Sequence, residues 1–262
     1  MLIISSIVLF TDYVISSPDF LMKQIENSNT FTSVYNSLIE KYENKSNTTA
    51  IPAEVYTDVI SEEWVTTSVK NYIFYLYQSP EPQNDIIDFT EIEKSITNYF
   101  EKYADDNNVI KDSIYEKKLS DVIENTKKEI IDTVDVYRTE VLRKTNLINK
   151  IFRLKEHIKK ILIASVIIML LFILIHILLK NPVYWIGTAL FSSGLLLIIP
   201  TAYLSVTSYI MNFSIKDYII YNLVTNTLSN IIHIFLNTGI IMSLSGILAI
   251  LITIIIQRKK NK

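Results

Sequence analysis

The sequence predicts an all-α membrane protein, in which a small extracytoplasmic helical bundle ends in a long helix that continues into a C-terminal set of transmembrane helices. From Ile161 onward the chain is almost continuously apolar until the basic tail at 257–262. Residues 18–160 are polar and carry apolar residues at helical spacing. Only 4 glycines and 6 prolines occur in 262 residues, which disfavours a β-sandwich.

Composition narrows the possible functions. The 25 Lys and Arg residues nearly balance the 27 Asp and Glu residues, so we expect no nucleic-acid partner. The absence of cysteine excludes disulfides, thiolate metal sites and cysteine nucleophiles. Three histidines at scattered positions provide no catalytic cluster, so we expect neither an enzyme nor a bound cofactor or metal.

The first segment, 1–17, is predicted to be a transmembrane segment or signal anchor. Its apolar run is interrupted by Asp12, and no Lys or Arg precedes it, although such segments normally begin with a basic region. We therefore expect the true start of translation to lie upstream.

The polar segment, 18–160, is predicted to be a helical extracytoplasmic domain of about four helices. Ser61 is expected to cap one helix, and Thr90 to Glu93 to form a capping box that opens another. Each expected helix has an apolar face; these faces are Phe31, Val34, Tyr35, Leu38 and Tyr42, then Val65, Val69, Tyr72, Ile73 and Leu76, then Ile92, Ile96, Tyr99, Phe100 and Tyr103.

The last helix of this domain is predicted to be very long. Neither proline nor glycine occurs between Ser113 and Pro182, and apolar residues keep approximate helical phase as far as Phe152. We therefore expect one helix that leaves the domain and enters the first clear span.

Three later segments, 161–179, 183–206 and 240–256, are predicted to cross the membrane. His176 in the first is interpreted as an interfacial residue, the alternative being a proton or ligand site. Pro182 suits the start of the second helix, and Pro200 is expected to kink it. In the third, Gly239, Ser243 and Gly246 form a small face, which we expect to pack against a neighbouring span of the same chain.

Between the second and third spans, residues 214–237 are predicted to form an amphipathic helix. One face is a polar stripe, our candidate interaction face, made of Asn222, Asn226, Asn230, His233 and Asn237. We expect this stripe to lie outside the hydrocarbon, because unpaired amides in lipid are costly. The alternative is a fourth crossing that lines a polar pathway.

Two basic clusters favour a membrane topology that conflicts with three predicted spans. One precedes the first clear span, from Arg143 to Lys160, and the other is the tail 257–262. The positive-inside rule would place both in the cytoplasm, which requires an even number of crossings between them. Three crossings instead place them on opposite sides, and the sequence leaves both arrangements open.

Several local patterns carry a family resemblance over nearly the whole chain. They are Phe31 to Asn36, the Ile51-Pro52 break, Ser61 to Val65 opening a helix toward Tyr77, and the asparagine-rich helix before the last span. In these the chain resembles uncharacterised integral membrane proteins of clostridia and related Firmicutes. The resemblance implies one N-terminal span, a helical extracytoplasmic domain and three further hydrophobic segments, but no activity. The chain departs from that pattern in lacking a basic N-terminus.

From these observations we expect a multi-pass protein of the bacterial cytoplasmic membrane, with a binding, scaffolding or envelope-sensing role. Its expected partners are the lipid bilayer and another membrane or envelope protein. The alternative is an accessory subunit of a transporter or channel that uses the asparagine-striped helix within the membrane. The oligomeric state is left open.

Overall fold

The computed structural model describes residues 2–78, 86–139, 145, 147–178, 181–207 and 209–260. These residues form ten α-helices and one short 3-10 helix, and they contain no strand. The predicted all-α class is therefore confirmed. The chain separates into two compact units, each described here by itself. We call residues 21–149 with 217–220 the polar unit, and residues 1–20, 150–216 and 221–262 the apolar unit.

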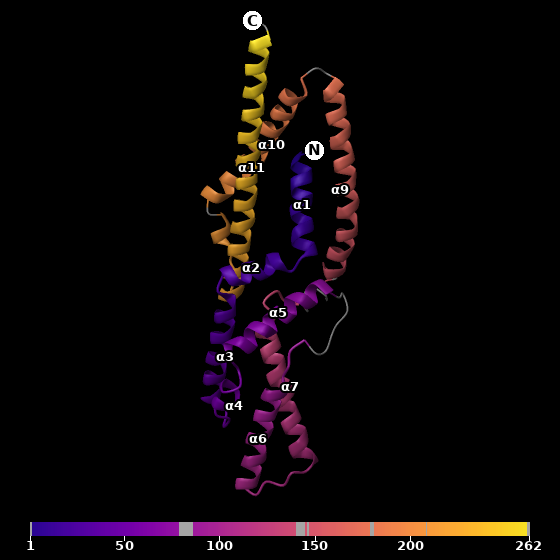
Figure 1. The fold of residues 1–262 in the computed structure, drawn as a ribbon. Coiled ribbons are helices and arrows are strands. Elements are labelled where there is room, and N and C mark those ends of the chain that lie inside the picture. The colour runs from indigo at the N-terminus through magenta and orange to yellow at the C-terminus, as the bar shows by residue number, and fades with distance from the viewer. Residues whose placement is uncertain are drawn as a thin grey trace. The chain divides into compact units, whose positions relative to one another are not determined.

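The polar unit is built on four long helices, as the sequence predicts. They are α3 (Thr30–Ser46), α5 (Glu62–Gln78), α6 (Thr90–Asp106) and α7 (Ser113–Val134). Helices α3, α5 and α7 contact one another, and α6 contacts α7 (Figure 1). Two shorter helices, α2 (Asp19–Asn27) and the single turn α4 (Glu54–Thr57), complete the described elements.

Large apolar side chains fill the core of the polar unit, and most come from the faces that the sequence predicts. Those that are at most 2% exposed include Val34, Leu38, Tyr42, Tyr56, Val65, Ile73, Ile92, Ile96 and Ile130. Tyr103, which was expected in this core, is instead 48% exposed near the end of α6.

The helix starts were predicted with mixed success. Ser61 accepts a hydrogen bond from the backbone N–H of Trp64 at 3.1 Å, so the predicted cap of α5 is confirmed. The predicted capping box at Thr90 is wrong, because Thr90 is already helical and follows Phe89 at the cap position. Its hydroxyl and backbone N–H donate instead to the Asp88 carboxylate, which lowers the pKa of Asp88.

The single long helix expected from residue 113 into the first span is interrupted. Helix α7 ends at Val134, and Arg138 has a left-handed backbone with φ of 51°. The Asp135 carboxylate accepts hydrogen bonds from the backbone N–H and the hydroxyl of Thr139 at 2.9 and 2.7 Å. An aspartate that bonds nearby backbone favours a turn over a continuing helix, which explains a break without glycine or proline.

The expected continuation from polar to apolar sequence does occur, but in a later helix. Helix α9 (Leu147–Leu178) begins in a basic segment and runs without interruption into the apolar residues after Ile161. The apolar unit also contains α1 (Leu2–Ser16), α10 (Pro182–Val206), the 3-10 helix η1 (Tyr209–Asn212) and most of α11 (Tyr218–Lys260). Helix α10 begins at Pro182, as predicted.

The asparagine-striped segment and the last span are one helix. Helix α11 runs for 43 residues through Asn237 and Ile240, where the sequence analysis had placed a boundary between two helices. At 1.5 Å per residue it is about 64 Å long, twice the hydrocarbon thickness of a bilayer. Neither proline nor a left-handed residue interrupts it, and Gly239 is held in the helix by packing against α10.

Among the described residues, two helical segments are long and apolar enough to cross a membrane, Pro182–Val206 and Tyr218–Lys259. A third is added if α1 and α2 are counted together as one bent span. The apolar stretch of α9 over Lys160–Ile175 is shorter. These features identify an all-α membrane protein.

Candidate functional site: the outer face of α11 and the polar sites

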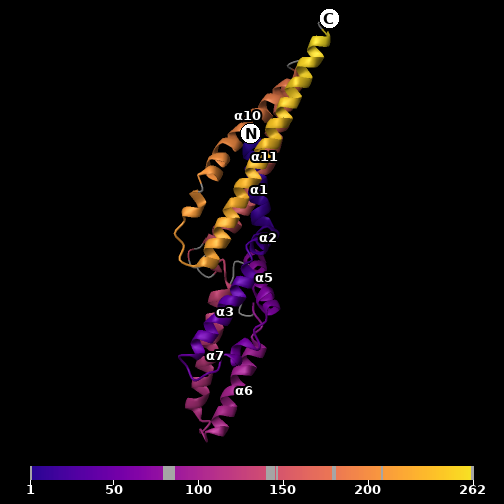
Figure 2. The ribbon, with the colours of Figure 1, turned by 90° about the vertical axis from the view of Figure 1, so that its left-hand side faces the viewer.

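The position of the polar stripe depends on how α11 packs against α10. The two helices lie side by side in Figures 1 and 2, and they run antiparallel, since Gly187 meets Gly246 and Gly194 meets Gly239. A Cβ on Gly246 would lie 2.6 Å from the Gly187 carbonyl oxygen, and one on Gly239 would lie 2.9 Å from the Gly194 carbonyl oxygen. The backbones therefore touch, which only glycine permits.

This glycine seam has a strict seven-residue repeat on both helices. The buried residues that follow this repeat are Thr225, Ile232, Gly239, Gly246 and Thr253 on α11, and Gly187, Gly194 and Thr201 on α10. A seven-residue repeat keeps one face of each helix against its partner over several turns. The predicted packing of Gly239, Ser243 and Gly246 within the chain is thus confirmed.

The candidate interaction face lies on the side of α11 away from the glycine seam. At about 100° per residue, Asn230 and Ile232 point about 160° apart around the helix axis. Asn226, His233 and Asn237 are exposed, while Asn222 and Asn230 are half-buried. Helix α11 therefore brings all five predicted residues onto one face.

Helix α1 contacts a third side of α11. The Phe10 and Phe235 rings meet edge to face with centroids 4.9 Å apart, and the Ser6 hydroxyl lies 3.9 Å from the Met242 sulfur. Phe235 is about 60° from the seam position Ile232 around α11, on the side opposite to the stripe, so α1 does not cover the stripe.

The level of the stripe along the unit follows from the register of the helices. Gly194 of α10 lies opposite Gly239 of α11. Because the helices are antiparallel, the residue six positions after Gly194, Pro200, lies opposite the residue six positions before Gly239, which is His233. Met169 and Ile173 of α9 line the same cavity as Trp185 and Ala189 of α10. Along α9, Lys160 lies about 14 Å before Met169, and along α10, Pro200 lies about 17 Å after Ala189. Because α9 and α10 run antiparallel, Lys160 and Pro200 lie at a similar height along the unit. The stripe from Asn222 to His233 thus lies level with the charged part of α9.

The apolar unit contains a cavity of about 390 Å³ among α1, α9 and α10. Aromatic and aliphatic side chains dominate its wall, including Phe172 and Trp185, and the small residues Ala189, Ser192 and Ser193 leave the space open. The volume is within the range of small-molecule sites.

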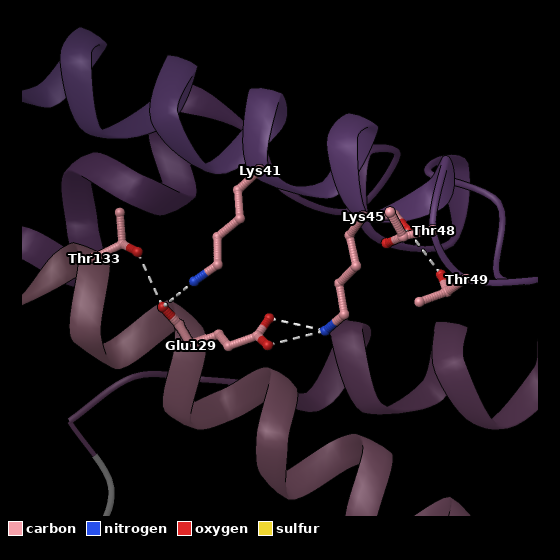
Figure 3. Close-up of polar contacts among 6 residues, drawn as sticks. All are labelled: Lys41, Lys45, Thr48, Thr49, Glu129 and Thr133. Carbon is pink, nitrogen blue, oxygen red and sulfur yellow. Dashed lines mark hydrogen bonds and ion pairs between the residues drawn. The ribbon is translucent and has the colours of Figure 1, made fainter.

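A cluster of polar contacts in the polar unit joins α3 to α7 (Figure 3). The Lys45 ammonium donates to both carboxylate oxygens of Glu129 at 3.0 and 2.9 Å, and the Lys41 ammonium reaches the Glu129 carbonyl oxygen at 3.4 Å. Lys45 also lies over the stacked rings of Tyr42 and Tyr56, whose centroids are 4.3 Å apart. Burial raises the pKa of both tyrosines, and the nearby Glu129 carboxylate raises them further.

This arrangement has the character of a structural clamp. Tyr42 and Tyr56 are almost fully buried, and both lie within the packed core of the polar unit. Sequence analysis did not find the pair, because 84 residues separate Lys45 from Glu129.

A polar cavity of about 510 Å³ lies at the end of α7. Carboxylates dominate its charged lining, which consists of Glu40, Asp132, Asp135, Asp217 and the guanidinium of Arg138. Arg138 donates to the Asp132 carbonyl oxygen at 2.6 Å and pairs with Asp217 at 3.4 Å. Asp217 in turn caps α11 by accepting from the backbone N–H of Ile219 and of Ile220.

The cavity has the chemistry to accept a small polar or cationic molecule, with hydroxyls of Ser33 and Thr133 as further partners. Sequence analysis missed it, because the turn at Asp135 was predicted to be helical. Within the described ranges, no three carboxylate or histidine side chains come together in a way that would hold a metal ion.

Comparisons of this chain with protein-family models, with curated proteins and with solved structures gave no match. The resemblance to clostridial membrane proteins therefore stays a prediction.

Proposed function

We propose that the chain is a multi-pass protein of the bacterial cytoplasmic membrane whose polar unit lies outside the cell and has a binding or sensing role without catalysis. In this topology the basic tail is cytoplasmic. The proposal rests on one observation, which is that the two units differ in how much of their apolar side chains they expose. The apolar unit exposes Leu196, Ile199 and Ile241 at 62, 66 and 65%, whereas the polar unit buries most of its large apolar side chains.

The polar cavity beside α11 supports a binding role. It combines four carboxylates and one guanidinium with hydroxyl groups, and it lies at the first residues of the helix that continues into the apolar unit. A ligand bound there would contact Asp217 and Ile220 at the start of α11. Scaffolding of another membrane or envelope protein is the related role that the polar stripe on α11 supports.

The continuity of α11 supports an odd number of crossings between the two basic clusters. With α11 as one helix, α9, α10 and α11 make three antiparallel passes, which set Lys150 and Arg258 at opposite ends of the apolar unit. A cytoplasmic tail then requires the polar segment before α9 to be outside.

Single-cysteine labelling tests this topology, because the chain has no cysteine of its own. Asn47 is exposed after the last turn of α3, and Gln257 is exposed near the end of α11. In intact cells, Asn47→Cys should react with a membrane-impermeant maleimide and Gln257→Cys should react only after lysis. The reverse pattern would overturn the proposed orientation, and labelling of both in intact cells would overturn the odd number of crossings.

A further inference from the structure

The basic residues before the apolar part of α9 form a stripe on one exposed side of that helix. Lys150, Arg153, His157 and Lys160 are all exposed and follow one another at intervals of three, four and three residues. We call them the basic stripe. The buried residues Ile158 and Ser165 lie on another face, seven residues apart. The helix thus packs through one face and presents positive charge on another.

The basic stripe directly adjoins a segment suited to hydrocarbon. Residues 147–160 contain five Lys and Arg residues and the single acid Glu156, whereas residues 161–178 contain no Asp, Glu, Lys or Arg. Lys150 precedes Ile161 by eleven residues, which is about 17 Å along a helix. All four side chains therefore lie in the lipid headgroup layer or within about one Debye length, about 10 Å, above it.

The positive-inside rule can account for only one of the two basic clusters. Because α11 is a single helix, the basic stripe and the tail at Arg258 lie at opposite ends of the apolar unit. This step rests on the proposed topology, in which the tail is cytoplasmic. The rule then accounts for the basic residues of the tail. The basic stripe would then be on the outer side, where topology gives no reason for a concentration of positive charge.

We propose that the basic stripe is a binding surface for the phosphate headgroups of anionic phospholipids. The charges are complementary, the stripe lies at headgroup level, and it continues into a helix that would contact the acyl chains of the same lipids. Each Lys or Arg near an anionic bilayer contributes about 1 kcal/mol, which corresponds to about a fivefold change in association. Lipid selectivity at this end of α9 should therefore depend on these side chains.

The experiment uses the full chain with one tryptophan placed at the stripe. The chain has two tryptophans, so Trp64→Phe and Trp185→Phe remove the native signal, and Ile161→Trp introduces a reporter at a position that is 45% exposed. The protein is reconstituted into vesicles of phosphatidylcholine and phosphatidylglycerol in which one lipid at a time carries brominated chains. Fluorescence quenching then gives the relative association of the two lipids at residue 161.

We expect phosphatidylglycerol to be favoured several-fold over phosphatidylcholine at residue 161. The triple variant Lys150→Gln, Arg153→Gln, Lys160→Gln should bring that preference close to one, and about 1 M salt should have a similar effect. The matched control keeps Trp185 as the single reporter, near the opposite end of the apolar unit. Its lipid preference should be the same with and without the triple substitution.

Two outcomes would overturn the proposal. One is equal association of the two lipids at residue 161, and the other is a preference that survives the triple substitution. Replacing chloride by inorganic phosphate at constant ionic strength separates a headgroup surface from a discrete phosphate site. If phosphate abolishes the preference while chloride does not, the site binds free phosphate and the headgroup proposal is wrong. Because both leaflets have the same composition, the result does not depend on orientation, so its failure is distinguishable from failure of the topology.

Discussion

The two units are held together in different ways. The polar unit buries whole aromatic and aliphatic side chains, including Tyr42, Tyr56 and Leu38, at 0 to 1% exposure. The apolar unit places all four glycines of the chain in one seam, where the backbones of α10 and α11 touch. Water drives the burial of large apolar side chains, but lipid gives no such driving force between helices. Each unit thus has the packing that its own solvent favours.

The largest effect should come from truncating a core side chain of the polar unit. Leu38 is completely buried, so Leu38→Ala should lower the free energy of unfolding of that unit by about 3 kcal/mol through lost transfer energy and a cavity. Trp64 reports on the polar unit and Trp185 on the apolar unit, so thermal unfolding of the full chain can follow each in turn. The control Leu196→Ala, at a site that is 62% exposed in α10, should leave the Trp64 transition unchanged. Equal shifts at both tryptophans would break the comparison.

A smaller loss of stability is expected in the apolar unit when a substitution adds one carbon atom to a tightly packed position, instead of removing side-chain atoms. A Cβ on Gly194 would lie 2.5 Å from the Gly239 carbonyl oxygen and 2.7 Å from the Ser243 backbone nitrogen. Gly194→Ala should therefore destabilise the Trp185 transition by about 2 kcal/mol. Helix propensity alone predicts the reverse sign, a gain of about 1 kcal/mol. Ser205→Ala on an exposed position of α10 is the control, and a stabilised Gly194→Ala variant would refute contact between the backbones.

Changes at the buried tyrosines of the polar unit should have the smallest effect on stability at neutral pH, but a distinct effect at high pH. Burial raises the pKa of Tyr77 to about 12, and it raises the pKa of Tyr42 and Tyr137 as well. A raised folded pKa contributes stability that is complete below the unfolded value near 10 and is lost as pH rises through the folded value. The polar unit should therefore unfold progressively above about pH 10, with tyrosinate absorbance and helical circular dichroism changing together.

Tyr42→Phe provides the comparison for that titration. The buried Tyr42 hydroxyl has no hydrogen-bond partner among the described residues, so its removal should change stability at pH 7 by no more than about 1 kcal/mol and should weaken the alkaline transition. If all tyrosines ionise near pH 10 while the helices stay intact, these tyrosine side chains are not buried and the prediction is wrong.

Sequence reasoning succeeded where a local rule decides the structure. The Ser61 cap, the helix start at Pro182 and the buried face of α3 each depend on residues within one or two turns of each other. It failed at the turn after Val134, because no glycine or proline marks the break at which the Asp135 carboxylate bonds Thr139.

Contacts between distant residues were partly predictable. The repeat of Gly239 and Gly246 was recognised, and Gly187 and Gly194 show the same seven-residue spacing on the preceding span, so the pairing could have been found. The Lys45–Glu129 pair and the polar cavity at Asp217 had no comparable signal, since they depend on how separate helices meet.

The glycine seam has a consequence for how the protein can vary. Every replacement of glycine by another amino acid adds at least one carbon, so no exchange at residues 187, 194, 239 or 246 avoids the contact between backbones. Elsewhere the chain makes left-handed turns at Asn29 and Asn108 without glycine, and there several side chains are acceptable. Natural sequences that descend from this one should therefore exchange asparagine, aspartate and glycine at such turns, while the four glycines of the seam stay unchanged.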